Sequence, residues 1–401
     1  MAATPYRGAE ISDPSQAPDF SLVVVDSPLF HLLRRLRLCD DRLGLVHRRM
    51  LLAVLVLWAP PVALSWPGAL LAAHPGPPLL DDVGFHVRFL ITAPLLILAE
   101  PVVHLRLRVI VGQFRARGLV PASQSAQFDE AVRKAARLRN SILIELLMLG
   151  LVYAAGILFT LHRYQELGHS GWYSSPRGGL SPAGIWLVFV SLPILQLLLL
   201  RWYFRLLIWA RFLWRVSRID LDLNATHPDK AAGLGFLSES MNAFVPIAAA
   251  HGFLFAGMMA NRIFYAGASL TDFELELLGG GVFLIIVFAG PLLVFAPRLV
   301  REKRQGLLAY GRVGQSYVRT FREKWLDGGA DPDEPLIGSG DIQSLADLGN
   351  SYGASEQMRI TPFSLRSLLP FAAAFLLPIL PLVLTVMPAE QLLGKLVGIV
   401  F

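Results

Sequence analysis

The sequence predicts an all-α integral membrane protein, with about seven transmembrane helices and amphipathic helices on the cytoplasmic side. Of its 401 residues, 54% are hydrophobic and only 16% are charged, whereas a soluble domain carries about 25% charged residues. The apolar residues gather in runs long enough to cross a bilayer, and the basic residues gather in alternate loops between those runs. Together these observations indicate that lipid is the solvent for most of the chain.

The apolar runs define the spans, because a helix needs roughly 20 apolar residues to cross the hydrocarbon core. We expect spans at about 50–73, 83–105, 141–163, 182–206, 243–266, 278–297 and 366–387. The least regular runs are the first, which contains two adjacent prolines, and the fifth, which contains His251 and Arg262. The chain is thus expected to form an N-terminal cytoplasmic segment, 1–49, and a single seven-span domain, 50–401.

The distribution of lysine and arginine predicts the orientation. The segments rich in these residues are 1–49, 106–140, 207–242 and 298–365. The loops between them are poor in basic residues, and 74–82 and 267–277 contain none. Because cytoplasmic loops carry an excess of lysine and arginine, we expect a cytoplasmic N-terminus and an external C-terminus. The preference for arginine over lysine is typical of GC-rich bacterial genomes, so the expected location is a bacterial inner membrane.

The basic segments are also expected to contain helices. One should run from about Ser123 to Arg139, and a charged helix should continue the sixth span. After a turn-rich linker at 327–335, a second short helix is expected over Asp341–Met358. Tryptophans and arginines alternate after the fourth span and form an interfacial belt, which favours contact with anionic lipid headgroups.

Ionisable residues inside the spans are the first functional candidates, because an unpaired charge in hydrocarbon is costly. Glu100, Glu145 and His251 are expected at a similar depth on the cytoplasmic side, and Arg88 and Arg262 at a similar depth on the outer side. These residues could line a polar path or a binding site for an ion or small anion. The alternative is that they form interhelical ion pairs that fix the packing.

The most distinctive soluble motif is the turn that contains His227, Asp229, Lys230, Gly233 and Gly235. It opens like a calcium loop, but it lacks the glycine and the glutamate that such a loop needs at positions six and twelve. Its His-Pro-Asp sequence also occurs in co-chaperone domains, for which there is no room between two spans. A metal or phosphate site and a purely structural turn remain as alternatives.

Other sequence features limit the chemistry. Cys39 is the only cysteine, so an internal disulfide and a zinc site of four cysteines are excluded. We find no nucleotide-binding loop, dinucleotide fingerprint or nucleophile elbow, and we expect no metal and no cofactor. The net charge of +6 is explained by membrane topology, so no nucleic-acid partner is expected. The sequence does not decide whether the protein is an enzyme, but it favours a non-enzymatic one.

Two stretches resemble sequences in a group of uncharacterised bacterial multi-pass membrane proteins. They are His227–Leu237 and Asp341–Asn350, the second followed by Met358–Phe363 and a proline-rich last span. The resemblance implies an inner-membrane location, and no activity is assigned to the group. Because both stretches are expected in the cytoplasm, we hypothesise that the 220–236 turn docks against the 341–363 segment, with Asp229 near Gln343.

These features favour a channel-like or transporter-like protein. A non-catalytic membrane partner or signalling subunit is the first alternative, and a membrane enzyme acting on a phosphate-bearing lipid is the second. A homo-oligomer is compatible with each. A water-filled cavity at Glu145 would favour transport, and a closed bundle with a cytoplasmic docking surface would favour a partner. Convergence of His227, Asp229 and Lys230 in one pocket would favour chemistry.

Overall fold

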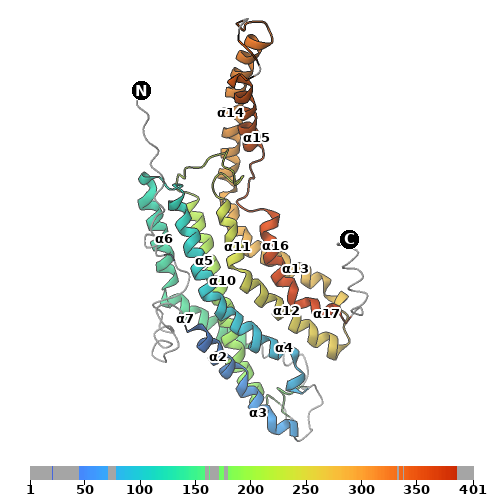
Figure 1. The fold of residues 1–401 in the computed structure, drawn as a ribbon. Helices are drawn as coiled ribbons and strands as arrows, with labels where there is room; N and C mark the ends of the chain where they lie inside the picture. The colour runs from blue at the N-terminus through green and yellow to red at the C-terminus, as the bar shows by residue number, and fades with distance from the viewer. Residues whose placement is uncertain are drawn as a thin grey trace.

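The computed structural model describes residues 20, 45–70, 78–158, 162, 171–175, 179–331, 334–336 and 338–385. Most of the expected N-terminal segment, with Cys39, lies outside these residues. The described residues are predominantly helical and contain no β-strand. They form an elongated bundle of helices, and a hairpin of two helices projects from one end of it (Figure 1). We call this end the hairpin end.

Five helices in the described part of the chain are long and apolar enough to cross a membrane. They are Val46–Trp66, Pro182–Val216, Val245–Ala266, Leu270–Trp325 and Leu365–Val383. A sixth span results if two helices that meet at a 45° bend, Ala122–Arg139 and Ile142–Gly156, count as one. The protein is therefore a helical membrane protein, but the expected number of seven spans is not confirmed.

The expected second span, 83–105, is not among these candidate membrane-spanning helices. Its segment is helical throughout, as α4 (Val83–His86), a π-helical turn η3 (Val87–Thr92) and α5 (Ala93–Ala116). Many of its side chains are fully buried, among them Phe89 and Leu96. Protein rather than lipid therefore covers much of this helix.

Short 3₁₀ and π-helical segments adjoin or connect many of the other helices. In chain order they are α2 (Val46–Leu57), α3 (Ala59–Leu70), α6 (Ser125–Arg139), α7 (Ile142–Leu151), η5 (Val152–Gly156), α9 (Pro182–Trp186), η6 (Leu187–Ser191), α10 (Leu192–Val216), η7 (Gly235–Ser238), α11 (Glu239–Ala243), α12 (Val245–Ala266), α13 (Glu274–Ala289), η9 (Gly290–Phe295), α16 (Leu365–Leu376) and α17 (Leu380–Val383). Pro94 and Pro193 each closely follow a π-helical turn. The wider turn accommodates a ring that would clash with the carbonyl four residues earlier in a regular helix.

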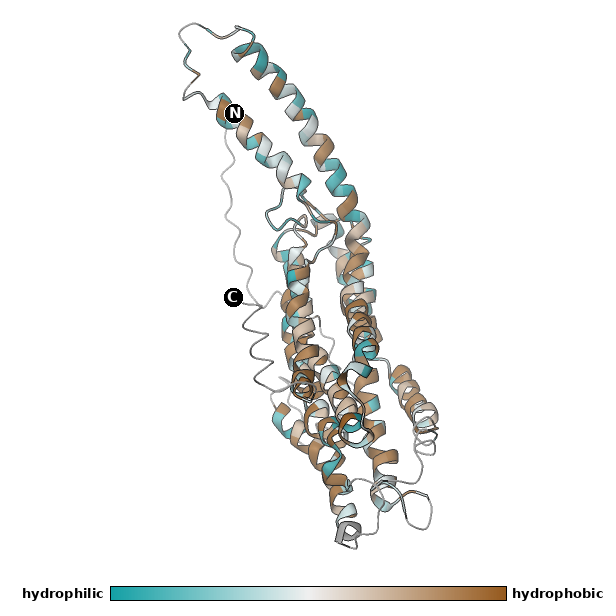
Figure 2. Ribbon diagram, turned by 90° about the vertical axis from the view of Figure 1, so that its right-hand side faces the viewer, coloured by the Kyte–Doolittle hydropathy of each residue, from teal (hydrophilic) through white to brown (hydrophobic). Residues whose placement is uncertain are grey.

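The core of the bundle packs α5 against α10 and α12. Trp202 and Trp209 of α10 are almost fully buried, and the Trp202 Nε1 donates to the Leu96 carbonyl of α5 at 3.0 Å. Large apolar side chains also cover the outside, for example Leu143 and Leu275, which are exposed. Figure 2 shows that hydrophobic residues, in brown, predominate along the helices of the bundle. An apolar exterior over an apolar core is what a lipid solvent requires.

The hairpin consists of α14 (Ala296–Trp325) and α15 (Gly340–Glu356). The expected charged continuation of the sixth span is α14, which at 30 residues is about 45 Å long. Asp341 fastens the far end of the hairpin, because its carboxylate accepts hydrogen bonds from Lys324 Nζ at 2.9 Å and Trp325 Nε1 at 3.0 Å. Polar and apolar residues alternate along both helices, in contrast to the bundle (Figure 2).

Candidate functional site

Glu100 of α5 lies in a buried ion cluster. Its Oε1 accepts a hydrogen bond from Arg205 Nη2 of α10 at 2.6 Å, and its Oε2 accepts one from Arg49 of α2. Glu100 and Arg205 are each 3% exposed, and the Arg205 guanidinium lies 4.6 Å from the Trp202 ring. The cluster links three helices and leaves the carboxylate with no free oxygen, which favours the structural interpretation of Glu100.

Glu145 lies in the same layer, beside a small cavity. Arg201 interacts electrostatically with both Glu100 and Glu145. The cavity has a volume of about 20 Å³, and its lining includes Arg139, Ser141, Glu145, Arg201 and Arg205. One water molecule needs about 10–15 Å³ measured in this way. The cavity therefore has room for about one water molecule or small ion, and it is no water-filled path through the bundle.

His251 forms no hydrogen bond with Glu100 or Glu145. Its ring lies between Tyr203 of α10, whose hydroxyl oxygen is 2.7 Å from Nε2, and the Ile247 carbonyl, which is 2.8 Å from Nδ1. A carbonyl oxygen only accepts, so Nδ1 carries a proton, and in the neutral ring Nε2 accepts the hydrogen bond of Tyr203. His251 therefore fixes α12 against α10 with both nitrogens engaged.

The two outer arginines do not form a shared site with an acid. Arg262 lies 5.7 Å from the Phe273 ring. Neither Arg88 nor Arg262 has an ion pair with any of the described residues. The polar centre at this end is instead Asp82, which accepts hydrogen bonds from Asn261 Nδ2 at 2.7 Å and Trp172 Nε1 at 3.0 Å.

Asp82 and Asn261 were not among the site residues expected from the sequence. The available signal was that Asp82 directly precedes an apolar helix, where it caps α4 by accepting the Phe85 N–H at 2.8 Å. The capping position explains one of its hydrogen bonds, and the two cross-helix bonds could not be read from the sequence.

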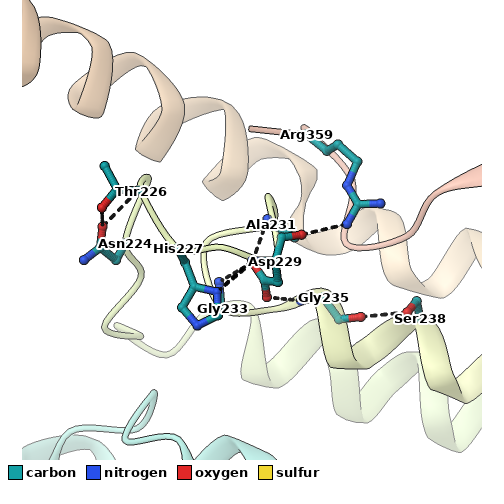
Figure 3. A network of polar contacts seen from close by, with 9 residues as sticks. All are labelled: Asn224, Thr226, His227, Asp229, Ala231, Gly233, Gly235, Ser238 and Arg359. Atoms are coloured by element: carbon teal, nitrogen blue, oxygen red, sulfur yellow. Dashed lines mark hydrogen bonds and ion pairs between the residues drawn. The ribbon is translucent and has the colours of Figure 1, made fainter. Parts of the chain in front are cut away.

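Asp229 organises the turn at the hairpin end (Figure 3). Its Oδ1 accepts the N–H groups of Ala231 at 2.8 Å and Gly233 at 3.1 Å, and its Oδ2 accepts that of Gly235 at 2.8 Å. The His227 Nδ1 lies 2.9 Å from Oδ1. Burial acts to raise the pKa of Asp229, but the three backbone N–H groups and His227 outweigh it and lower this pKa below its ordinary value.

This network holds an unusual backbone. Lys230 and Ala232 have positive φ angles of 56° and 53°, and Gly233 has one of 93°. Left-handed conformations cost side-chain-bearing residues about 1–3 kcal/mol, so the hydrogen bonds to Asp229 stabilise an otherwise unfavourable turn. Gly235 is required for a different reason, because a Cβ there would lie 2.9 Å from Asp229 Oδ2.

The turn docks against the segment that follows α15. The Arg359 N–H donates to the Lys230 carbonyl at 2.7 Å, and the Arg359 guanidinium donates to the Asp229 carbonyl at 2.9 Å. Lys230 Nζ donates to Gln357 Oε1 at 2.7 Å. The expected contact between the two segments is therefore present, but not at Gln343, whose side chain contacts Asp347 within α15.

The arrangement does not form a metal or phosphate pocket. The Asp229 carboxylate accepts hydrogen bonds from the backbone of its own turn, and the Lys230 ammonium group donates to Gln357 instead of pointing toward Asp229. No group of three histidine, cysteine, aspartate or glutamate side chains in the described part of the chain could hold a metal ion. The geometry of this turn supports the structural alternative.

A further cluster of charged residues, mostly arginines, lies on the exposed surface of the hairpin. Seven exposed residues of α14 and Leu326, which directly follows it, recur at spacings of three and four, so they form one stripe along the helix. They are Arg301, Arg304, Leu308, Arg312, Gln315, Arg319, Arg322 and Leu326. We call this stripe the basic face of α14. On the other side of α14, the Tyr317 hydroxyl donates to the Asp341 carbonyl of α15 at 2.9 Å, and Gly311, at the edge of the stripe, lies against Tyr352 of α15.

The arginines of the basic face are available to a partner. Only Arg322 has an ion pair among the described residues, with Asp327 at 3.5 Å, and both side chains are exposed. Leu308, in the middle of the stripe, is 61% exposed. In the sequence these arginines served only to predict the orientation, and their common face becomes apparent once α14 is known to be one continuous helix.

Comparisons with known proteins give no relative: no family model matches the sequence, and no curated protein or solved structure is significantly similar to it. The function must therefore be argued from the geometry.

Proposed function

We propose that the protein is a non-catalytic membrane partner or signalling subunit that presents the basic face of α14 to an acidic segment of another protein. It lies in a bacterial inner membrane, with its N-terminus and hairpin in the cytoplasm and its C-terminus outside. The distribution of lysine and arginine supports this orientation. The observation that carries the proposal is the row of exposed arginines without strong ion pairs on a projecting helix.

The length of the basic face favours a protein over the membrane surface. From Arg301 to Arg322 the helix rises about 30 Å, whereas the Debye length at physiological salt is about 8 Å. Anionic headgroups can therefore attract the base of the hairpin but not its far half. An acidic helix laid along α14 would meet all five arginines, and Leu308 and Leu326 would give it apolar contacts.

The hairpin is also held at its base, which supports a presenting role. Lys303 Nζ of α14 donates to the Met358 carbonyl at 2.9 Å, and Gly306 packs so closely on Ala225 that a Cβ would lie 2.4 Å away. Together with the Asp229 turn, these contacts fix the direction in which the hairpin leaves the bundle. A surface held in one direction loses little entropy on binding.

Transport and catalysis have less support. Both carboxylate oxygens of Glu100 are paired with arginines, and the cavity at Glu145 has room for little more than a water molecule. His227 and Asp229 converge, but Lys230 does not join them. The partner function is therefore preferred to both.

The proposal is tested by photo-crosslinking in native membranes. A photoreactive phenylalanine analogue is placed at Leu308 or Gln315 on the basic face, and at Val313 as the matched control, which is 57% exposed on another side of the same helix. We expect one adduct of defined mass at both stripe positions and none at Val313. The Arg304→Gln, Arg312→Gln, Arg319→Gln triple variant should lose the adduct.

Two results would count against the proposal. An equal adduct at Val313 would show contact without use of the basic face, and a triple variant with undiminished crosslinking would show that the arginines do not recognise the partner. Separately, an ion flux in liposomes that disappears with Glu145→Gln would support transport in its place.

A further inference from the structure

A groove at the hairpin end of the bundle has a shape and a lining that the partner function does not explain. It lies between α5 on one side and α11, α12 and α16 on the other, and its volume is about 930 Å³. Small-ligand sites in proteins have about 300–1,000 Å³. Its lining combines an apolar wall with two arginines, Arg106 and Arg117.

The apolar wall is continuous with the lipid-facing surface. Leu105 and Val109 of α5 line the groove and are each 62% exposed. The opposite wall includes Pro246 of α12 and Pro370 of α16, which have no N–H groups to offer. Such walls suit hydrocarbon chains rather than a peptide, whose backbone groups would lack hydrogen-bond partners there.

The two arginines of the groove suit an anionic headgroup. One guanidinium nitrogen of Arg106 donates to the Asn242 carbonyl at 2.9 Å, and its other donors remain for a ligand. Arg117 lies 4.9 Å from the Phe236 ring and donates from Nε to Gln113 at 2.8 Å, which leaves its two terminal nitrogens unused by described residues. The lining holds one acid, Glu239, which accepts a hydrogen bond from Asn242 Nδ2 at 2.9 Å.

We infer that this groove binds one anionic phospholipid, with its headgroup held by the arginines of the lining, Arg106 and Arg117, and its acyl chains along Leu105 and Val109. Two arginines against one glutamate give the lining a net positive charge. Basic pockets between transmembrane helices select anionic headgroups in this way. No residue of α14 lines the groove, so lipid binding here does not depend on the proposed partner function.

The inference is tested by native mass spectrometry of the full-length protein in detergent, titrated with phosphatidylglycerol or with phosphatidylcholine of the same acyl chains. We expect the wild-type protein to bind phosphatidylglycerol at least roughly ten-fold more tightly. The Arg106→Gln, Arg117→Gln double variant should lose this preference, because each arginine near a headgroup favours anionic lipid by about five-fold. Arg211→Gln, at an exposed position on α10 outside the groove lining, is the matched control and should keep the preference.

A second pair of variants tests the apolar part of the groove. Val109→Trp fills it from an exposed position that does not endanger folding, and should displace the lipid. Leu147→Trp, at a position that is 65% exposed on α7, should not. Equal loss in Arg211→Gln and the double variant would overturn the inference in favour of diffuse charge attraction. Displacement of phosphatidylglycerol by equimolar glycerol 3-phosphate would overturn it in favour of a site for a free anion.

Discussion

The Glu100 cluster and the basic face of α14 use the same side chain in opposite ways. In the bundle, Arg205 is buried, the Arg49 side chain is only 11% exposed, and the two share one carboxylate. On the hairpin, Arg304 and Arg312 are exposed, and no described residue pairs with them. Buried charges must be paired to be tolerated, whereas exposed charges cost little and remain free to bind. The charges inside the membrane therefore hold the fold, and the charges outside it are the candidates for function.

The largest effect is expected for Glu100→Gln. The substitution leaves Arg49 and Arg205 buried without a counter-charge, and breaking a buried pair in this way costs about 3–5 kcal/mol. We expect a correspondingly lower unfolding free energy in detergent, measured with a denaturant titration. Glu276→Gln is the matched control, because Glu276 is exposed on α13. If both variants were equally stable, the cluster would not hold the fold together.

This cluster also shows how far the sequence predicts the site. Depth along a span follows from counting residues, so the sequence could place Glu100 and Glu145 at a similar depth, and Arg201 interacts with both. The direction in which each side chain points around its helix axis does not follow, and His251 turns to Tyr203 instead. Arg49 was missed because it was assigned to the basic segment before the first span, although α2 already begins at Val46.

At the fold level, composition and charge alternation were sufficient for a helical membrane protein and for the helix that became α15, whereas the docking of the Asp229 turn was expected from the two stretches that carry the resemblance. They were not sufficient for the number of spans. The segment around α5 is as apolar as a lipid-facing helix, but it lies in the centre of the bundle, and hydropathy cannot separate these two environments. The Asp229 turn was expected near Gln343, but it lies near Gln357. The sequence does not show which end of α15 faces the bundle.

A smaller effect is expected for Asp229→Asn. The amide can accept fewer of the backbone hydrogen bonds and brings an N–H group toward other donors, which costs about 1–3 kcal/mol. Hydrogen exchange should report the loss locally, with faster exchange of the Ala231, Gly233 and Gly235 amides. Asp220→Asn is the control, because the Asp220 side chain is 90% exposed. Unchanged protection in Asp229→Asn would mean that the turn does not depend on the carboxylate.

The same carboxylate predicts a still smaller dependence on pH. The pKa of Asp229 is lowered in the folded protein from its ordinary value of 3.8, so its ionised form stabilises the fold at higher pH. The stability difference between wild type and Asp229→Asn should be constant above about pH 5 and should shrink as pH falls through and below 3.8. A difference that instead grew on acidification would contradict the lowered pKa.

The smallest effect on stability is expected at the basic face, where the largest effect on binding is proposed. The Arg304→Gln, Arg312→Gln, Arg319→Gln triple variant removes charges that no described residue engages, so its unfolding free energy should lie within about 0.5 kcal/mol of wild type. Relief of repulsion among neighbouring arginines would act toward greater stability. A loss of several kcal/mol would show that these arginines hold the hairpin together. Unchanged stability together with loss of the crosslinked adduct would show that the arginines of the basic face serve binding, whereas those of the Glu100 cluster serve folding.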